Sequence, residues 1–422
     1  MGKTDILKDL EKRGLLYQIT DRGALEKRLK AGPITLYIGF DPTADSLHIG
    51  NLLPMLCLRR FQMAGHNPIA VAGGGTGLIG DPSGRNLERA LNPEAIVHKW
   101  TEKIKNQLEK FLDFKSKTNP ARIVNNYDWL SSIKVIEFLR DTGKYFSIGN
   151  MLSKESVKSR LDTGISYTEF SYIILQAYDF LRLYQDYNCE MQAGGSDQWG
   201  NITAGTDLIK RVAGGAAYGL TFPLVTKSDD TKFGKTETGA IWLDPKKTTP
   251  YQFYQFWINA DDRDVVKFIN YFTFLPEDEI SDLEEKTKKE PEKREAQRVL
   301  AKEVTLLVHG EKEALSAEKI SQALFYGNLK DLSEEEIEEG FKDIPSMIIK
   351  NKKEIGIAEL ILAAGVLSSK RQAKAGISSG AISINGNIFS DTDKIISASD
   401  RLWNKYIIIR KGKKNYFLVK WM

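Results

Sequence analysis

Cysteine and histidine are scarce in this chain of 422 residues. It contains two cysteines, Cys57 and Cys189, and four scattered histidines. A disulfide framework and a thiolate metal cluster are therefore excluded, and no zinc-site spacing is visible, so we expect no metal held by a protein cage. Long apolar runs are missing as well. Leu360–Leu367 is among the longest, and a bilayer-spanning helix needs ~20 residues, so we expect no membrane partner.

The beginning of the sequence shows no targeting signal. Met1–Arg13 alternates acidic, basic and apolar residues and lacks the apolar core of a signal peptide. We therefore expect a cytoplasmic protein. At ~150 residues per domain, the length predicts about two or three domains. A charged fraction of 27% with 10% aromatic residues is typical of folded chains.

Charge is distributed unevenly along the chain, whose net charge is +4. Residues 352–422 carry 13 Lys and Arg against 5 Asp and Glu, a net +8, whereas the other 351 residues sum to −4. A solvated basic surface would by itself explain this asymmetry. A compact basic module on a mildly acidic body also predicts a polyanionic partner bound at this end.

Short apolar segments alternate with longer amphipathic ones in the first half of the sequence. Strands separated by helices predict an α/β fold with a Rossmann-like, largely parallel sheet that is covered on both faces. Ligands collect beyond the carboxyl ends of the strands in that architecture. The predicted strands are Thr35–Gly39, Pro68–Ala72, Arg122–Val124 and Glu190–Gln192, and the predicted helices are Gly50–Ala64, Asn92–Phe114 with Asn92 as its cap, and Thr168–Tyr184.

The second half follows a different pattern. Residues 251–343 are mostly helical, and Ile344–Glu354 has the character of a linker with few features that could fix it to the body. The basic end predicts two helices, a hairpin turning on Asn385-Gly386 and two further strands. We therefore predict a Rossmann-like catalytic domain at 1–223, a mobile lysine loop at 224–250, a helical domain at 251–343 and a small α+β module at 352–422.

A glycine-rich stretch, Gly75-Thr-Gly77-Leu-Ile-Gly80, follows a predicted strand and matches the dinucleotide fingerprint. An assignment of the chain as a nicotinamide-dependent oxidoreductase would depend on this match alone. The match is weak, because Asp81-Pro-Ser-Gly84 predicts a turn where the fingerprint needs a helix, and no acidic strand end follows ~20 residues later. We interpret the glycines as a tight loop that lets backbone approach a ligand.

Two motifs suit the binding of phosphate. In Tyr37-Ile-Gly-Phe-Asp41-Pro-Thr43-Ala-Asp-Ser-Leu-His48-Ile-Gly50-Asn51, a strand runs into a polar turn and His48 falls at the amino end of the next helix. Donors and the positive helix dipole coincide there. In Lys232-Phe233-Gly234-Lys235-Thr236, a loop presents a lysine pair and a hydroxyl. Either motif alone also fits a structural role, but together they indicate a lid over a polyphosphate.

A polar stripe marks the predicted helix Thr168–Tyr184. Tyr172, Gln176 and Asp179 are spaced i, i+4, i+7 and share one face, while their neighbours make the rest of the helix apolar. An exposed polar stripe is the alternative interpretation. Buried polar groups require partners, so the stripe predicts a pocket that can hold an ammonium group and hydrogen-bond a phenol.

The first motif resembles the His-Ile-Gly-His signature of class I aminoacyl-tRNA synthetases, and the second resembles their Lys-Met-Ser-Lys-Ser loop. Gly73–Arg85, Tyr172–Leu183 and Gln192–Thr203 resemble the bacterial tyrosyl-tRNA synthetases in particular. Ser368–Ala373 and Gly380–Gly386 resemble an RNA-binding module shared with a small-subunit ribosomal protein. Asn51 replaces the second histidine of the signature, and Phe233-Gly234 replace Met-Ser. Both lysines and the terminal hydroxyl, the chemically necessary groups, are kept.

The resemblance implies a tyrosine–tRNA ligase that activates L-tyrosine with ATP and transfers it to tRNA(Tyr). An α-carboxylate with a pKa of ~3.5 is already ionised at pH 7, so attack on the α-phosphate needs no general base. The task is to orient the substrates and to stabilise the leaving pyrophosphate. ATP with Mg²⁺ is implied as substrate, without a tightly bound organic cofactor, and a homodimer is implied as well.

The expected site residues fall into four groups. The catalytic group is Thr43, His48, Lys232, Lys235 and Thr236. By the resemblance, tyrosine is held by Tyr37 and Asp179 at its hydroxyl, by Asp81, Tyr172 and Gln176 at its amino group, and by Gln192. The ATP-binding residues are Gly39, Asp41, His48, Gly50, Asn51, Gly195, Asp197, Gln198 and Lys235. The tRNA-binding residues are Lys370, Arg371, Lys374, Lys411, Lys413 and Lys414.

Two rival functions remain open from the sequence. A tryptophan-specific sibling synthetase shares the fold, but Tyr37 with Asp179 favours a phenol. An RNA-binding scaffold with a vestigial catalytic half is the other alternative, and the lysine pair Lys232 and Lys235 counts against it.

Overall fold

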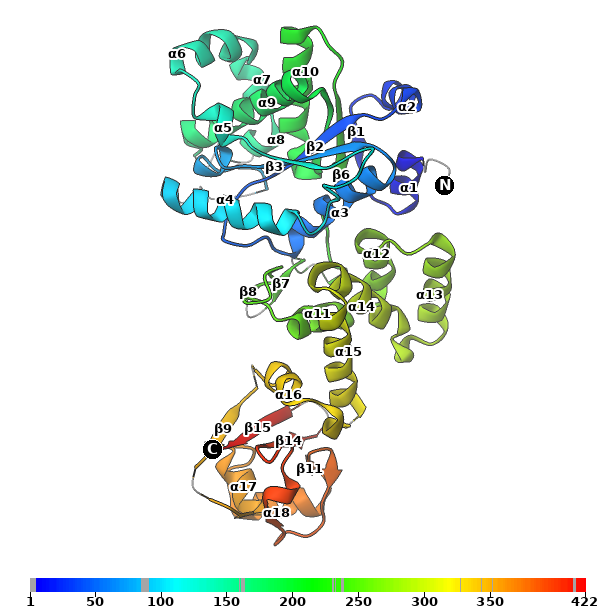
Figure 1. Cartoon of the computed structure of the whole chain (residues 1–422), viewed down its shortest axis with the longest axis vertical. Coiled ribbons are helices and arrows are strands. Elements are labelled where there is room, and N and C mark those ends of the chain that lie inside the picture. The colour runs from blue at the N-terminus through cyan, green and yellow to red at the C-terminus, as the bar shows by residue number, and fades with distance from the viewer. Residues whose placement is uncertain are drawn as a thin grey trace. The chain divides into compact units, whose positions relative to one another are not determined.

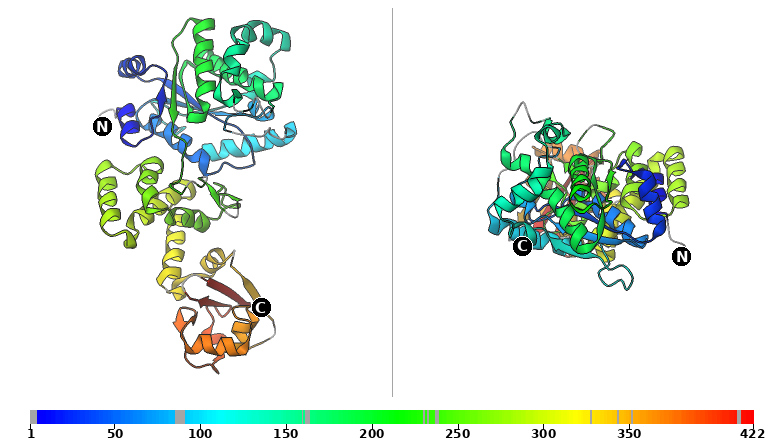
Figure 2. Two further views of the ribbon diagram at one scale, coloured as in Figure 1. Left: turned by 180° about the vertical axis from the view of Figure 1, so that it is seen from behind. Right: turned by 90° about the horizontal axis from the view of Figure 1, so that it is seen from above.

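The structure is a computed structural model that describes residues 5–84, 91–158, 160, 164–229, 231, 233–236, 239–326, 328–342, 344–350, 352–412 and 415–422, with the backbone alone at 155, 156, 235, 236 and 326. The chain divides into two compact units. The first comprises Met1–Thr248 and Ala260–Leu300, and the second comprises Thr249–Asn259 and Ala301–Met422. Figures 1 and 2 show the ribbon from several sides.

A six-stranded sheet forms the centre of the first unit, in the order β1-β6-β5-β2-β3-β4. All neighbouring pairs are parallel except β1 with β6 at one edge. The order reverses between β5 and β2, because the chain continues from β2 to β3 and β4 on one side and to β5 and β6 on the other. The strands are β1 (Gln18–Ile19), β2 (Thr35–Phe40), β3 (Asn67–Ala72), β4 (Arg122–Asn125), β5 (Cys189–Gly195) and β6 (Tyr218–Phe222).

Helices cover both faces of this sheet, as predicted for parallel strands. On one face, Tyr37, Ile69 and Val71 share a buried core with α9 (Tyr167–Tyr187) and α10 (Trp199–Ala213). On the other face lie α3 (Ile49–Met63) and α4 (Glu94–Leu108), which Figure 1 shows across the sheet from α9 and α10. Because side chains alternate along a strand, burial on both faces explains why β2 and β3 are continuous apolar runs.

Within the described part of the chain, no helix is both long and apolar enough to cross a membrane.

Smaller elements complete the first unit. The remaining elements are α1 (Ile6–Lys12), α2 (Arg22–Ala31), η1 (Thr76–Leu78), α5 (Tyr127–Leu130), α6 (Val135–Glu137), η2 (Phe138–Thr142), η3 (Gly143–Tyr145), α7 (Ile148–Leu152), α8 (Glu155–Lys158), η4 (Ser196–Gln198), β7 (Lys235–Thr236), β8 (Gly239–Ala240), α12 (Asp262–Phe272), α13 (Glu277–Lys289) and η5 (Pro291–Lys293).

The predicted parallel-sheet α/β class is confirmed, and so are the four predicted strands of the first half, within one to three residues at their ends. The helix predicted at Asn92–Phe114 is shorter than expected. It begins at Glu94 after Pro93, so the predicted Asn92 cap is wrong, and it ends at Leu108. Its end has a tertiary cause, because the chain turns to bury Phe111, and Gln62 of α3 accepts a hydrogen bond from the Asp113 N–H at 2.9 Å.

Helices and a second sheet build the other unit. Helix α14 (Glu295–His309) contributes residues to both units. The helices are α11 (Pro250–Ile258), α15 (Glu311–Tyr326), η6 (Leu329–Asp331), α16 (Glu334–Gly340), α17 (Ile357–Ala363), α18 (Lys370–Ser378) and η7 (Ala398–Asp400). The strands are β9 (Ser346–Ile349), β10 (Ile355–Gly356), β11 (Ile382–Ile384), β12 (Asn387–Ile388), β13 (Ile395–Ile396), β14 (Tyr406–Lys411) and β15 (Asn415–Trp421).

The five-stranded sheet β12-β11-β14-β15-β9 is buried on both faces. On one face, Ile407 and Ile409 of β14 join a core with α17 and α18. On the other face, Tyr406 and Ile408 join a core with α15 and α16. The predicted hairpin is confirmed, with Asn385 and Gly386 at φ of 48° and 82°, the left-handed values of a tight hairpin turn.

Part of the predicted linker Ile344–Glu354 is a strand, so that prediction is wrong there. Ser346–Ile349 form β9, which pairs in parallel with β15. Ile349 is buried in the core beneath the sheet. Four residues are too few to show a periodic pattern, and their pairing partner lies about seventy residues further along the chain.

Candidate active site

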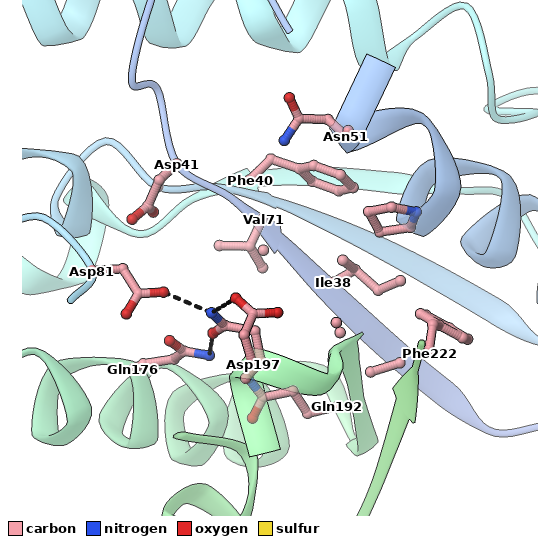
Figure 3. Close-up of a pocket in the computed structure, with 18 of the residues that line it drawn as sticks. Ile38, Phe40, Asp41, Asn51, Val71, Asp81, Gln176, Gln192, Asp197 and Phe222 are labelled. Atoms are coloured by element: carbon pink, nitrogen blue, oxygen red, sulfur yellow. Dashed lines mark hydrogen bonds between the residues drawn. The ribbon is translucent and has the colours of Figure 1, made fainter. Parts of the chain in front are cut away.

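A cavity of about 330 Å³ opens at the carboxyl ends of β2, β3, β5 and β6, where the strand order reverses. This is the place where open parallel sheets bind ligands. Asp41 follows β2, Gly73 follows β3, Gly195 ends β5 and Pro223 follows β6, and all four line the cavity. Figure 3 shows side chains from these strand ends converging with side chains of the helices.

The cavity brings together most of the residues predicted to bind tyrosine and ATP. Its lining contains Tyr37, Gly39, Asp41, Thr43, His48, Gly50, Asn51, Asp81, Tyr172, Gln176, Asp179, Gln192, Gly195, Asp197 and Gln198. The lysine motif is described in part only. Lys232 lies outside the described residues, and Lys235 and Thr236 are described by their backbone, which forms β7.

One end of the cavity is formed by Tyr37 of β2 and Asp179 of α9. Asp179 is 3% exposed; its Oδ2 accepts from Asn126 Nδ2 at 2.8 Å and its Oδ1 from Trp129 Nε1 at 2.7 Å. Burial raises the pKa of Asp179 to about 8, although these two donors oppose the rise. Tyr37 Oη and Gln192 Oε1 are also buried, and neither has a hydrogen-bond partner among the described residues. Such unmatched buried groups call for a ligand or water.

A chain of hydrogen bonds fixes Asp41 beside this end. Tyr172 Oη donates to Asp41 Oδ2 at 2.7 Å, and Thr76 Oγ1 donates to Asp41 Oδ1 at 2.7 Å. Asn126 Nδ2 donates to Thr76 Oγ1 at 2.8 Å, while the Gly75 N–H donates to Asn126 Oδ1 at 2.7 Å. The glycine stretch thus forms the short η1 helix and a supporting loop. It does not begin the long helix that dinucleotide binding requires.

Gln198 is the centre of a second network, and Figure 3 shows Asp81, Gln176 and Asp197 of this network converging. Its Nε2 donates to Asp81 Oδ2 at 2.6 Å and to Asp197 Oδ2 at 3.1 Å. Its Oε1 accepts from Gln176 Nε2 at 3.2 Å and from Asn201 Nδ2 at 3.2 Å. Burial raises the pKa of Asp197, with Gln198 opposing and Asp81 adding to the rise. The polar stripe of α9 is therefore a pocket wall.

The cavity is acidic. Among the described residues that line it are Asp41, Asp81, Asp179 and Asp197, and no lysine or arginine. Such a lining favours an ammonium group. A polyphosphate would need positive charge or N–H donors from elsewhere, and the amino end of α3, where His48, Gly50 and Asn51 line the cavity, offers N–H donors.

His48 caps the amino end of α3, as predicted. Its Nδ1 accepts from the Gly50 N–H at 3.0 Å, and its own backbone N–H donates to Asn51 Oδ1 at 3.1 Å. With Nδ1 accepting, the neutral ring carries its proton on Nε2, which makes that atom a donor. A side chain at Gly50 would collide with the His48 ring, because a Cβ there would lie 2.8 Å from its Cε1. Glycine at this position therefore keeps the helix end open.

The backbone of the lysine loop lies against this helix end. The Ile49 N–H donates to Ile241 O at 2.9 Å, and the Leu243 N–H donates to Leu47 O at 2.9 Å. The Trp242 ring meets the His48 ring edge-on at 6.2 Å. The structure thus places Ile241–Leu243 of the lysine loop beside the amino end of α3, although the two segments are about 190 residues apart in the sequence.

The residues predicted to bind tRNA lie in the second unit. Lys370, Arg371 and Lys374 are exposed on α18, and Lys374 Nζ donates to Asp393 Oδ1 at 2.8 Å. Lys411 ends β14, half-buried, with its Nζ donating to Val366 O at 3.3 Å. Lys413 and Lys414 lie outside the described residues. The exposed α18 cations form a surface that a phosphate backbone can approach.

Three residues that orient the site were missed by reasoning from the sequence: Thr76, Asn126 and Trp129. Thr76 belongs to the glycine stretch, which was interpreted only as a loop. Asn126 directly follows β4, so the rule that sites form beyond strand ends could have found it. No signal in the sequence marks Trp129, whose partner Asp179 lies fifty residues further on.

Comparisons with known proteins define first the class and then the family. The family model described as tRNA synthetases class I (W and Y) matches residues 29–326, most of the chain. A second model, described as Tyrosine--tRNA ligase SYY-like C-terminal domain, matches residues 336–419. The chain therefore belongs to the class I tRNA synthetases.

Individual relatives narrow this class. The Tyrosine--tRNA ligase of Desulfitobacterium hafniense is 60% identical and Tyrosine--tRNA ligase 1 of Bacillus subtilis is 58% identical, each over 99% of both chains. The crystal structure of a C-terminally truncated mitochondrial tyrosyl-tRNA synthetase from Aspergillus nidulans has a TM-score of 0.70 and 32% identity, over 77% of this chain and 95% of that one. The chain belongs to the tyrosine–tRNA ligase family.

Proposed function

We propose that this chain activates L-tyrosine with ATP and transfers the tyrosyl group to the 3′ end of tRNA(Tyr). In the first step, a carboxylate oxygen of tyrosine bonds to the α-phosphorus of ATP, and the bond to pyrophosphate breaks. The tyrosine carboxylate is itself the nucleophile, so the residues of the site bind, orient and stabilise charge.

The observation that carries this proposal is a pair of unmatched groups among the residues that line the cavity. Tyr37 Oη and Gln192 Oε1 are buried without a partner among the described residues, and Asp179 lines the same cavity. A phenol can donate to one neighbour and accept from another, whereas an indole N–H can only donate and a phenyl ring can do neither. The site therefore suits tyrosine better than tryptophan or phenylalanine.

The amino group of tyrosine fits the wall formed by Asp81, Tyr172 and Gln176. Asp81 supplies a carboxylate, and Gln176 and Tyr172 supply oxygen acceptors. Gln198 holds Asp81 and Gln176 in place through the hydrogen bonds described above. The substrate carboxylate would then face the open side of the cavity, toward the ATP phosphates.

The ATP site lies where the two phosphate motifs meet. Gly39, Asp41, Gly50, Asn51, Gly195 and Asp197 are assigned to the nucleoside, with Gln198 at its edge. Thr43 and His48 approach the phosphates from α3, and Lys232, Lys235 and Thr236 from the lysine loop. Mg²⁺ enters with the ATP phosphates; among the described residues, no group of three or more acidic, histidine or cysteine side chains could hold it.

Binding of tRNA is assigned to the helical segment 251–343 and to the basic module 352–422. The net +8 of that module and the exposed cations of α18 support this assignment. Lys370, Arg371, Lys374, Lys411, Lys413 and Lys414 are the proposed phosphate contacts.

A homodimer is part of the proposal. Short helices of the first unit expose apolar side chains, with Val135 70% and Ile136 74% exposed. Leu139, Ile148 and Tyr167 are exposed nearby in sequence. Apolar surface of this kind is typical of an interface, and a second copy of this chain would cover it. The mass in solution should therefore be twice that of the chain, and Ile136→Glu should lower it to that of a monomer.

Exchange of labelled pyrophosphate into ATP tests the activity. The chain should catalyse exchange that depends on tyrosine. Exchange that depends on tryptophan instead would identify a tryptophan-specific synthetase. A complete lack of exchange would favour an RNA-binding scaffold without catalytic activity.

A further inference from the structure

The beginning of the lysine loop is bound to one face of α12. Lys267 Nζ donates to Thr226 O at 2.7 Å and to Asp264 Oδ1 at 2.8 Å. Asp264 Oδ2 accepts from the Ser228 N–H at 2.9 Å and from its hydroxyl at 3.0 Å. Asp264 is only 3% exposed. Burial opposes its charge, yet the hydrogen bonds from Lys267 and Ser228 outweigh burial and lower the pKa of this carboxyl group.

An aromatic contact continues along the same face. The ring of Phe233 lies 5.4 Å from that of Phe272 in a stacked arrangement of 12°, and 5.3 Å from that of Phe268. Asp264, Lys267, Phe268 and Phe272 are spaced i, i+3, i+4 and i+8, so they share one side of the helix. We call these four residues the α12 platform.

The next residue is held from the opposite side. Gly234 has φ of +76°, and a Cβ there would lie 2.4 Å from Ile49 Cγ2 at the start of α3. Its carbonyl oxygen accepts from the Ile241 N–H at 3.1 Å. The pair Phe233-Gly234 is thus fixed between the α12 platform and the helix that carries His48. The lysines of the motif, Lys232 and Lys235, are the immediate neighbours of this pair in the chain.

We propose that the α12 platform positions the lysine loop for adenylate formation, with Phe233 as the side chain through which it acts. The proposal rests on the function proposed above. Asp264, Phe268 and Phe272 are positioning residues in this scheme, because they contact the loop and not the cavity. The structure explains why Phe233-Gly234 can replace Met-Ser in this motif. The ring of Phe233 stacks on Phe272, and Gly234 fits against Ile49.

The test compares Phe233→Leu, which removes the stacked ring but keeps an apolar side chain, with Phe111→Leu. Phe111 is 3% exposed at the end of α4 and lines no part of the cavity, so its variant controls for the loss of a buried ring. Phe233→Tyr keeps the ring and serves as the rescue variant. For each protein, pyrophosphate exchange gives kcat and KM, equilibrium dialysis gives the Kd of tyrosine, and thermal unfolding gives Tm.

Phe233→Leu should lower the kcat of exchange by about 10- to 100-fold, because a lysine displaced by ~1 Å loses much of its contact with the leaving pyrophosphate. The Kd of tyrosine should stay unchanged, and Phe233→Tyr should restore most of kcat. Asp264→Asn should lower kcat in the same way and should speed tryptic cleavage after the lysines of the loop.

Other outcomes overturn the proposal. An unchanged kcat in Phe233→Leu would show that the platform does not position the loop. If Phe233→Leu lowered kcat and tyrosine affinity by equal factors, and Phe111→Leu did the same, Phe233 would have a structural role only. These outcomes are distinct from failure of the proposed function, which would appear as a lack of tyrosine-dependent exchange in the unaltered chain.

Discussion

Asp179→Asn is a substitution whose consequences the geometry of the pocket predicts in detail. Each carboxylate oxygen of Asp179 accepts one hydrogen bond, from Asn126 Nδ2 and from Trp129 Nε1. An amide has one oxygen, so its NH₂ group would face one of these two donors. An unsatisfied buried donor costs about 1–3 kcal/mol, and the variant should lose that much stability near pH 4, where the burial of charge contributes little.

The stability difference between the two proteins should change with pH. Burial raises the pKa of Asp179 from 3.8 to about 8, so between these values the folded protein holds a proton that the unfolded chain has released. The unaltered protein therefore loses stability as pH rises through this window, by on the order of 5 kcal/mol at ~1.4 kcal/mol per pKa unit. The side-chain amide of the variant does not titrate, so Asp179→Asn should be the less stable protein at pH 4 and the more stable one at pH 9.

Selectivity should fall in the same variant. Losing a buried hydrogen-bond partner costs about 1–3 kcal/mol, so the preference for tyrosine over phenylalanine should fall roughly 5- to 100-fold. The KM of ATP should not change, because Asp179 is assigned to the hydroxyl group of tyrosine and not to ATP.

Two assays check these statements. Urea unfolding at pH 4, 7 and 9 measures the stability difference, and pyrophosphate exchange with tyrosine or phenylalanine measures the selectivity. A stability difference that stays constant with pH would refute the raised pKa, and an unchanged preference for tyrosine would place the specificity site elsewhere.

Further predictions concern each part of the proposed site. Tyr37→Phe removes a hydroxyl that has no described partner, so unfolding should show equal or higher stability, while exchange should show a roughly 2- to 10-fold weaker preference for tyrosine. Lys235→Ala should slow adenylate formation by ~3 kcal/mol, the cost of losing one donor to developing charge, with the Kd of tyrosine unchanged by equilibrium dialysis. Replacing Lys370 and Arg371 by Ala should leave exchange intact but weaken tRNA binding, and the slope of affinity against salt should become shallower by ~1 per lost phosphate contact. Removal of residues 352–422 should abolish transfer to tRNA but keep tyrosine activation, because all residues that line the cavity belong to the first unit. A parallel loss of both activities would refute the separate role of the module.

The regular parts of the fold could be predicted from the sequence because their patterns are local. Helix α9 was predicted at Thr168–Tyr184 and spans Tyr167–Tyr187, since its apolar and polar faces repeat over many turns. The end of α4 could not be predicted, because a side chain of α3, Gln62, takes the N–H of Asp113 and turns the chain. Strand β9 was missed for a related reason. Its short apolar run becomes a strand only beside β15.

In the candidate site, too, some residues could be found from local motifs, whereas the residues that position them depend on tertiary contacts. The motif around His48, the polar stripe and the family resemblance singled out Tyr37, His48 and Asp179, and the structure brings all three into the cavity lining. Their roles toward tyrosine and phosphate stay predictions. Asn126 and Trp129, which hold Asp179, come from a segment with no motif of its own.

The lysine loop extends this argument to catalysis. Its lysines are visible in the sequence, but the role of Phe233 depends on Phe268 and Phe272, which lie 35 and 39 residues further along the chain. Neither phenylalanine of α12 lines the cavity, so a search for reactive side chains would pass over both. If the position of the lysines limits the rate, substitutions on the α12 platform should lower kcat without lowering the affinity for tyrosine. Substitutions at Asn126 should instead weaken tyrosine selection, because that residue donates a hydrogen bond to the carboxyl group of Asp179.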